Sequence, residues 1–371
     1  MTDGAAAQRF PIGRVVTLGA FILDVLGRPV QSIPPGQGSV LLQEIRATAA
    51  GTAAGPAVDL AKLGAQVSAI GALGDDVIAD IIVAILERHG VDTAGLARRP
   101  GVQTAATMLP IRPNGERPAL HVPGAMTELR PADIDLGVVR GCDVLLIGAP
   151  DALGGIAAAA DGLPAVAAAA RAGGAIVVID MLRRGTRTDF GRLAGLIGAA
   201  DWFCPNGSQL LGLTGRSDIA DAIGDVLALG TGGVAVTLGA DGCLVTDADG
   251  GLLHITAPRV DVVDTTGCGD GFDAGMITGL LLGCGQADAA RLGTACGSLV
   301  ATGLGSDAGI TSLDDAVAFL GRADPAAAAR ISARIPVTAN GCAAASSTGG
   351  PGRPASHSEQ AGYRVGRCGR R

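Results

Sequence analysis

The most informative stretch of the chain is "DTTGCGDGFDAG", residues 264–275, in which two glycines and a cysteine directly precede a carboxylate at the start of a predicted helix. The apolar residues Phe272, Met276 and Leu280 that follow have helical spacing. Small residues at a helix N-terminus leave backbone N–H groups and the positive end of the helix dipole open to an anion. We therefore predict an anion-binding site in front of this helix.

Asp270 falls in the first turn of this predicted helix, where it would face whatever the N–H groups bind. A carboxylate beside such amides suits phosphoryl transfer, because the acid takes a proton from a hydroxyl while the amides stabilise the transferring group. The stretch fits equally well a helix in which Asp270 is an N-cap and the glycines form a tight turn. By itself it leaves a catalytic and a structural role open.

A second group of candidate residues lies near the N-terminus. Asp24 ends the segment "TLGAFILD", and Gly51 and Gly55 precede another predicted helix. Ligands of doubly wound sheets bind at the carboxyl ends of strands, so Asp24 is placed to accept hydrogen bonds from substrate hydroxyls. A turn capped by Asp24 would give the same pattern.

Strand-like and helix-like segments alternate along most of the chain, which predicts an α/β fold with a mostly parallel sheet between two helical layers. We expect strands at 14–19, 66–71, 143–148, 175–180, 202–204 and 234–239, and helices at 53–63, 77–89, 156–172 and 218–229. The fold class is therefore a three-layer, doubly wound, Rossmann-like α/β sheet.

Two segments interrupt this alternation. Residues 24–50 read as extended, and residues 104–122 read as a hairpin around Asn114-Gly115, the strongest short hairpin signal. We expect about 24–50 and 100–124 to form a small β-sheet lid on a domain spanning 12–322. From residue 323 the chain is rich in Ala, Gly, Ser and Arg, which predicts a disordered basic tail over 323–371.

Composition restricts the class of partner. The chain has 371 residues, 48% of them hydrophobic, and a net charge of −7 with a pI near 5.1. This balance argues against nucleic acid or an anionic membrane and favours a small molecule. Eight cysteines without a C-x-x-C pair, and no signal-like or membrane-spanning stretch, predict a cytoplasmic protein. The only lysine, Lys62, lies outside any P-loop motif.

The stretch "DTTGCGD" resembles the second signature, D-T-x-G-A-G-D, of the ribokinase-like, PfkB-type carbohydrate kinases. Further resemblances follow the order of that family over roughly residues 14–320. They are "LAKLGAQVSAIGALGDD" (60–76), "PGAMTELRPADID" (123–135), the pair Pro205-Asn206 and "VTLGADGCLV" (236–245).

The resemblance implies a role for each matching position. Asp270 would be the catalytic base, in front of an anion hole made by Gly267, Cys268 and Gly269. The remaining matches imply substrate binding at Asp24, Gly51 and Gly55, ATP binding at Asn206, Thr237, Gly239 and Gly242, and a monovalent cation such as K⁺ at Asp264 and the Thr266 carbonyl.

The chain departs from the family pattern at three places. Gly55 stands where the family's G-G-x-x-x-N loop has asparagine, and Gln209 stands where its N-x-x-E motif has a glutamate linked to Mg²⁺. Glutamine keeps an acceptor oxygen but loses the charge that holds a water-linked Mg²⁺. Pro150, with Asp151 beside it, replaces a glutamate that binds substrate in some members. Substrate identity and magnesium affinity are thus open.

The resemblance favours an ATP- and Mg²⁺-dependent kinase that phosphorylates a primary hydroxyl of a sugar or sugar-like substrate beneath the lid. Two alternatives stay open: a nucleoside kinase of the same superfamily, and a catalytically impaired sugar-binding regulator, for which Gly55 and Gln209 speak. Two further expectations concern Cys268, whose thiol at a helix N-terminus should have a lowered pKa and react with alkylating agents, and the lid edge, which would pair across a homodimer.

Overall fold

The computed structural model describes residues 11–247 and 251–336. The main sheet of this region has the order β13-β12-β11-β10-β9-β8-β1-β4-β5. Neighbouring strands run parallel from β11 to β5, whereas β12 and β13 are antiparallel additions at one edge. The strands are β1 (Arg14–Leu18), β4 (Gln66–Gly74), β5 (Asp92–Arg99), β8 (Val144–Gly148), β9 (Ile176–Asp180), β10 (Trp202–Phe203), β11 (Gly233–Thr237), β12 (Cys243–Asp247) and β13 (Leu253–Ile255).

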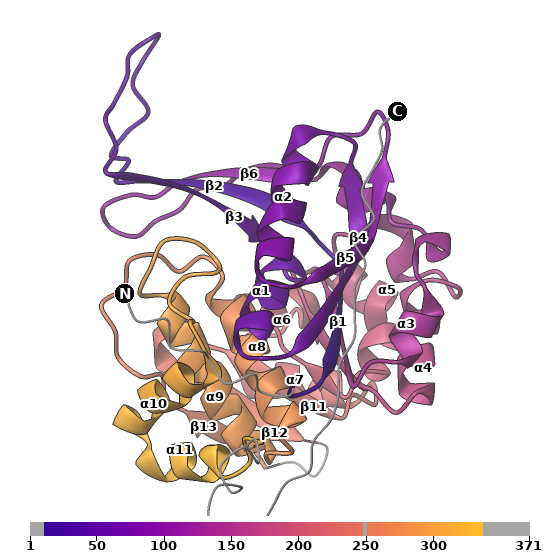
Figure 1. Cartoon of the computed structure of the whole chain (residues 1–371). Helices are drawn as coiled ribbons and strands as arrows, with labels where there is room; N and C mark the ends of the chain where they lie inside the picture. Colours follow the sequence, from indigo (N-terminus) through magenta and orange to yellow (C-terminus); the bar gives the residue numbers. More distant parts are fainter. Residues whose placement is uncertain (1–10, 248–250, 337–371) are drawn as a thin grey trace, which may run out of the picture. The chain divides into compact units, whose positions relative to one another are not determined.

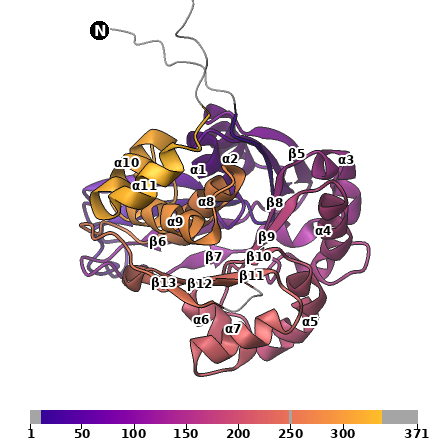
Figure 2. The same ribbon diagram turned by 90° about the horizontal axis from the view of Figure 1, so that it is seen from below.

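Helices cover both faces of this sheet, which confirms the predicted three layers (Figure 2). One layer holds α1 (Ala54–Lys62), α2 (Val77–Arg88), α8 (Cys268–Leu281), α9 (Gln286–Val300), α10 (Leu313–Ala323) and α11 (Pro325–Ser332). The other holds α3 (Leu136–Arg140), α4 (Leu163–Ala172), α5 (Arg187–Gly198), α6 (Gly207–Thr214) and α7 (Ile219–Leu227). Short 3₁₀ turns are η1 (Gly124–Glu128), η2 (Pro131–Asp133), η3 (Gly154–Ala157) and η4 (Gly239–Asp241).

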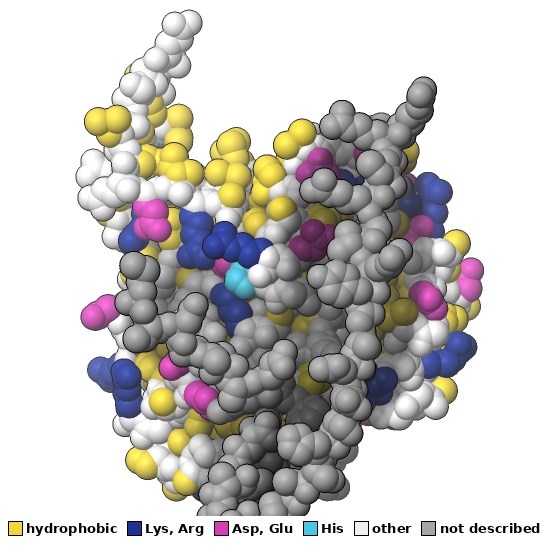
Figure 3. Space-filling model, viewed as in Figure 1, with side chains coloured by type: hydrophobic (Ala, Val, Ile, Leu, Met, Phe, Trp, Pro, Cys, Tyr) yellow, Lys and Arg dark blue, Asp and Glu magenta, His cyan; other side chains and the backbone are white. Residues whose placement is uncertain are grey.

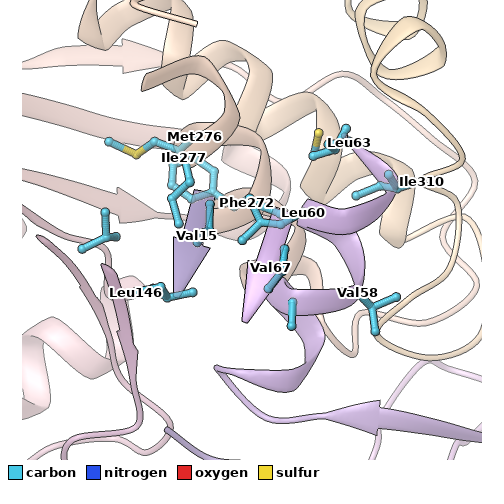
Figure 4. Close-up of a cluster of buried hydrophobic side chains, with 14 of the residues drawn as sticks. Val15, Val58, Leu60, Leu63, Val67, Leu146, Phe272, Met276, Ile277 and Ile310 are labelled. Carbon is cyan, nitrogen blue, oxygen red and sulfur yellow. The ribbon is translucent and has the colours of Figure 1, made fainter. Parts of the chain in front are cut away.

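The central strands are apolar on both faces, so each feeds two cores. On β1, Val15 packs into the core beneath α1 and α8, while Val16 packs into the core beneath α3 to α7. On β8, Leu146 likewise packs into the core beneath α1 and α8, and Ile147 packs into the core beneath α3 to α7. Figure 4 shows the first core, where Phe272 of α8 lies among side chains of β1, β8 and α1. This packing holds α8 above the sheet.

A separate sheet with the order β3-β2-β6-β7 forms the lid and extends away from the main sheet (Figure 1). Its strands are β2 (Ile22–Arg28), β3 (Glu44–Ala50), β6 (Ala106–Pro110) and β7 (Leu120–Val122). The predicted hairpin joins β6 to β7 and turns at Gly115, whose N–H donates to the Arg112 carbonyl at 2.9 Å.

The two faces of the lid differ in chemistry because side chains alternate along each strand. One row of paired residues across the four strands reads Thr48, Asp24, Thr107 and His121. The adjacent row, on the opposite face, reads Ala47, Val25, Met108 and Leu120, and all four are exposed. The lid therefore has a polar face that carries Asp24 and an apolar face turned to solvent.

Two of the predicted segments differ from the structure. The helix expected at 156–172 begins only at Leu163, because η3 and a turn ending at Gly162 precede it. The tail expected from residue 323 is helical up to Ser332: α11 begins at Pro325, the Asp324 side chain caps it, and Ile331 is fully buried. The helical spacing of the buried residues in α11 was not recognisable in the sequence, because half of the residues of this segment are alanines. Residues 337–371 of the predicted tail lie outside the described residues.

Among the described helices, none is long and apolar enough to cross a membrane.

Candidate active site

The predicted helix after the glycine run is α8, and its start has the expected geometry. Gly267 is the N-cap residue with φ of +79°, a left-handed conformation that favours glycine. A Cβ atom at this position would also collide with Ser306. Asp270 follows in the first turn and is 8% exposed. The N-terminal N–H groups of α8 and the Asp270 carboxyl therefore lie at the same helix end.

Gly55 of α1 packs directly against the carboxyl group of Asp270. A Cβ atom built on Gly55 would lie 2.5 Å from Asp270 Oδ2, closer than atoms can approach. The glycine at this position therefore leaves the space that the carboxylate occupies, and an asparagine here would displace Asp270. Gly51, at the turn between β3 and α1, accepts a hydrogen bond from the Gly55 N–H at 3.0 Å. The glycine that stands at position 55 in place of the family's asparagine therefore matches the position of the Asp270 carboxyl group.

The acid groups of the site influence one another. Burial raises the pKa of Asp270 to about 7, and the nearby Asp24 carboxylate adds to the increase, while Arg117 opposes it. Burial also raises the pKa of Asp24 to about 6, against the effects of a hydrogen bond from Thr107 and of the Arg117 charge. These mutual effects show that the charges of Asp24 in the lid and Asp270 in α8 act on each other. The expected position of Asp24 at the carboxyl end of a strand is wrong, because Asp24 lies within β2 of the lid.

Asp24 lies in the polar row of the lid and is 7% exposed. On one side it neighbours Thr48, and on the other Thr107, whose Oγ1 lies 3.1 Å from His121 Nδ1. Arg117, in the turn between β6 and β7, reaches the segment before α8, where its Nε donates to Thr265 Oγ1 at 3.1 Å. The lid and the N-terminus of α8 are joined through this contact.

Cys268 departs from one expectation. Its backbone N–H donates to the Thr265 carbonyl at a long 3.4 Å, and its side chain is partly buried beside the apolar core. Burial raises the pKa of the Cys268 thiol to about 12. The predicted lowering of this pKa is wrong, because loss of solvation outweighs the helix terminus, and the group is a neutral thiol at physiological pH.

Asp264 is buried and organises the loops behind the N-terminus of α8. Its Oδ1 accepts from the Thr266 N–H at 3.0 Å and the Thr266 hydroxyl at 2.8 Å, and its Oδ2 accepts from the Gly305 N–H at 3.0 Å. Ser306, next to Gly305, packs against Gly267. The Asp264 carboxylate thus supports the turn that presents the predicted anion hole.

The residues predicted to bind nucleotide come together at the carboxyl end of β11. Asn206 forms a bridge with Thr237, and the Thr237 N–H donates to the Pro205 carbonyl at 3.0 Å. Gly239 and Gly242 bound the turn η4 that follows. The structure therefore joins two segments that are about thirty residues apart in the sequence.

The side chain of Gln209 stabilises the start of α6. Its Oε1 accepts from the Asn206 N–H at 2.7 Å in a capping box, and its Nε2 donates to the Met181 carbonyl at 2.8 Å. The side chain is 8% exposed and both of its ends have partners. A similar structural role falls to Asp151, whose carboxylate accepts from the N–H groups of Leu182 and Arg183 at 3.0 and 2.9 Å.

Three buried carboxyl groups beside the site were missed by the sequence analysis, those of Asp59 in α1, Asp180 and Asp273. Asp180 ends β9, and Asp273 lies one turn after Asp270 on α8. Burial raises the pKa of both well above the ordinary range, and the neighbouring Asp270 contributes in each case. Asp180 had a usable signal, since it ends a predicted strand where ligands of α/β sheets bind. Arg117 had none, because a lone arginine in a hairpin is unremarkable.

A doubly wound α/β sheet, a helix N-terminus open to anions with a buried carboxyl group beside it, and a lid carrying a second carboxylate together define a phosphotransferase acting on a small hydroxylic substrate. The model of the pfkB family carbohydrate kinases matches residues 13–313. The chain belongs to this family and is a carbohydrate kinase.

Two curated proteins illustrate the relationship. The ATP-dependent ribose-1-phosphate kinase of Halopiger xanaduensis is 31% identical over 313 residues, which cover 83% of this chain and 98% of that protein. The aminoimidazole riboside kinase of Salmonella typhimurium is 30% identical over 283 residues, covering 73% and 87% of the two chains. Among solved structures, a putative ribokinase from Agrobacterium tumefaciens has a TM-score of 0.72 at 26% identity, covering 84% of this chain and 98% of that one.

Proposed function

We propose that this chain transfers the γ-phosphoryl group of ATP to a primary hydroxyl of a sugar, with Asp270 as general base. The observation that carries this proposal is the position of Asp270, buried in the first turn of α8 and electrostatically coupled to Asp24 of the lid. A base with a pKa of about 7 suits a reaction at neutral pH, since it is substantially ionised there and still accepts a proton readily.

Two carboxylates and a set of backbone N–H groups take part in the proposed reaction. Asp24 accepts hydrogen bonds from the sugar and holds it under the lid. The Asp270 carboxylate takes the proton of the primary hydroxyl, whose oxygen forms the new bond to the γ-phosphorus. The bond to the β-phosphate oxygen breaks, and ADP leaves with the electron pair. Backbone N–H groups of Gly267, Cys268 and Gly269 stabilise the phosphoryl group during transfer.

The metal would be held mainly by the nucleotide. In residues 11–247 and 251–336 no three acidic, histidine or cysteine side chains converge as metal ligands, and Gln209 is committed to Asn206 and Met181. Mg²⁺ usually keeps several of its waters and is bound largely by substrate phosphate oxygens, a mode that needs few protein ligands. When bound, it neutralises charge on the phosphates. Asp264 and the Thr266 carbonyl would hold a monovalent cation such as K⁺.

The general base is tested by Asp270→Asn. We expect turnover, measured as ADP release with a coupled assay, to fall by about 10²- to 10⁴-fold, while ATP affinity by calorimetry stays within about threefold. Asp80→Asn, which removes an exposed carboxylate on α2, is the matched control and should keep full activity. Unchanged turnover in Asp270→Asn would exclude the mechanism.

A substrate panel separates the sugar kinase from its alternatives. Ribose, fructose, 2-keto-3-deoxygluconate and adenosine would be assayed in parallel. Preference for adenosine would identify a nucleoside kinase, for which the likeness to aminoimidazole riboside kinase speaks. Binding of a sugar without any ADP release in the presence of Mg²⁺ would identify a regulator.

The apolar face of the lid supports a homodimer. Val25, Met108 and Leu120 are 38%, 59% and 56% exposed and form one row across the sheet. In the view of Figure 3 hydrophobic side chains gather over the lid and the neighbouring α2. A second copy would cover this face by an isologous contact, in which the same apolar row meets itself. A cytoplasmic location is supported by the free thiols of all six described cysteines.

A further inference from the structure

We propose that Arg46 of β3 is a positioning residue for phosphoryl transfer, which fixes the lid to the loop behind the N-terminus of α8. This loop, residues 304–307, connects α9 to α10 and is called the support loop below. The inference rests on the proposed function, because it concerns how the sugar under the lid is aligned with the phosphoryl group at α8. Arg46 acts through the support loop and makes no contact with the substrate.

The guanidinium group of Arg46 holds the support loop at two points. Its Nη1 donates to the Leu304 carbonyl at 2.9 Å, and its Nη2 donates to Asp307 Oδ1 at 2.8 Å. The side chains of Arg46 and Asp307 are 37% and 10% exposed, so the ion pair is partly removed from solvent. Hydrogen bonds from a charged donor are stronger than neutral ones, and two of them fix the loop against the lid strand.

The carbonyl groups of the support loop depend on donors from other elements. Residues 304–306 are buried and belong to no helix or strand, so their backbone groups need partners elsewhere in the fold. The Leu304 carbonyl accepts from Arg46, and the Asp307 carbonyl accepts from the Lys62 ammonium group of α1. Removal of the Arg46 side chain would take away the donor to a buried carbonyl group, and the loop would shift.

The support loop packs directly behind the N-terminus of α8. The Gly305 N–H donates to Asp264 Oδ2 at 3.0 Å, and a Cβ atom on Gly267 would lie 2.4 Å from the Ser306 Cα atom. Gly267 is the N-cap residue of α8, so a shift of Ser306 would move the turn that presents the proposed anion hole. A displacement of about 1 Å at reacting groups can cost about 10²-fold in rate.

The lid side of the same contact carries the proposed acceptor site. Thr48 lies two residues after Arg46 on the same face of β3 and pairs with Asp24 of β2. Thr48 also packs against the support loop, since a Cβ atom on Gly305 would lie 2.7 Å from Thr48 Cγ2. The strand that pairs with Asp24 and the loop that supports Gly267 are therefore in direct contact, and Arg46 holds them together.

Steady-state kinetics of Arg46→Ala, with the best acceptor of the substrate panel, provide the first test. We expect kcat to fall by at least about tenfold while both KM values stay within about threefold, because alignment matters in the transition state. Arg46→Lys keeps the charge but loses the planar pair of donors, so its kcat should be intermediate. Arg28→Ala is the matched control and should keep full kcat. Arg28 lies on the neighbouring strand β2, is 36% exposed, and bonds at 2.9 Å to Glu44 within the lid.

Hydrogen–deuterium exchange, measured by mass spectrometry, tests the support loop without catalysis. In Arg46→Ala we expect the amides of 264–270 and 304–307 to exchange at least about tenfold faster, because local opening becomes easier. Residues 163–172 of α4, in the opposite helical layer, should keep their rate, and Arg28→Ala should change neither region. If Arg46→Ala does not fold by circular dichroism, Asp307→Asn removes the charge of the same ion pair, and the same changes are expected in smaller size.

Three results would overturn the proposal. The first is an unchanged kcat in Arg46→Ala, with or without a raised KM. The second is full kcat in Arg46→Lys, which would show that the charge alone matters. The third is a lower kcat in Arg46→Ala with unchanged exchange, because the loop would then not have moved. If no acceptor is phosphorylated, the proposed function fails, and exchange still decides the role of Arg46. Faster exchange of 264–270 in Arg46→Ala would support it, and an equal rate would refute it.

Discussion

Asp270 shows how burial and a neighbouring carboxylate move the pKa of a carboxyl group close to neutral pH. Its pKa moves from 3.8 to about 7 because the ionised form loses solvation and faces Asp24. Since only the ionised form accepts a proton, we expect kcat/KM to rise tenfold per pH unit below about pH 7 and to level off above it. A profile that levels off near pH 4 would show that Asp270 is solvated in the working enzyme.

The raised pKa of Asp270 also lowers the free energy of unfolding at neutral and alkaline pH. The native state keeps the Asp270 proton up to about pH 7, whereas the unfolded chain releases it near pH 3.8. The native state thus binds more protons between these values, and stability falls as the pH rises through this window. Asp270→Asn should therefore be more stable than the unmodified protein at pH 8, by up to about 4 kcal/mol, and the difference should vanish near pH 4.

Thermal unfolding at several pH values measures the difference in stability between Asp270→Asn and the unmodified protein. Asp76→Asn is a control for which we expect the opposite sign. Burial would raise the pKa of Asp76, but hydrogen bonds from Thr104 and the Ala79 N–H lower it. Its contribution is present at neutral pH and lost in acid, so Asp76→Asn should be less stable at pH 8. A gain in stability for Asp76→Asn, or none for Asp270→Asn, would contradict the electrostatic account.

At the scale of elements, the close approach of α1 and α8 positions Asp270, the proposed general base. Gly55→Ala would place a methyl group 2.5 Å from Asp270 Oδ2 and force the carboxyl group to move. We expect kcat to fall by at least about tenfold, as a shift of about 1 Å in a reacting group can cost 10²-fold. The fold should remain intact by circular dichroism.

Gly191→Ala is the matched control for this substitution. Gly191 lies in α5, and a Cβ atom there would meet nothing within 4 Å. Alanine at this position should leave activity unchanged and slightly raise the melting temperature, because it stabilises the helix. Full activity in Gly55→Ala would show that Asp270 does not need its present position.

The elements also show why sequence patterns succeeded in some places and failed in others. Strands such as 144–148 were predictable because a run of apolar residues is typical of a strand covered on both faces. The start of α4 was not, since alanine-rich sequence continues through η3 and the turn before Leu163. In α11, small residues gave no visible apolar stripe, although Ala327 and Ile331 pack against the core. The start of α4 and the presence of α11 depend on the segments that pack against them, and no local sequence pattern contains this information.

At the scale of the whole molecule, the lid face predicts a dimer. Met108 lies in the middle of the exposed apolar row, so Met108→Asp would place a charge in any contact between two lids. We expect the unmodified protein to elute as a dimer with light-scattering detection and Met108→Asp to elute as a monomer. Val138→Asp, on the exposed side of α3, is the control and should not change the mass. A monomeric unmodified protein would refute the dimer.

The sequence by itself determined the α/β class and the glycine-rich start of α8, because the first depends on the periodicity of apolar residues and the second on a backbone conformation that glycine favours. It predicted the carboxylates Asp24 and Asp270 as site residues through the resemblance to the family. Only the tertiary structure decided how these parts act together. Strand pairing put Asp24 in a row with His121, helix packing set Asp270 against Gly55, and the lid turn brought Arg117 to Thr265. Burial and charge proximity arise between segments distant in the chain, so the raised pKa of Asp270 and the role of Gln209 follow from three-dimensional contacts and from no local pattern.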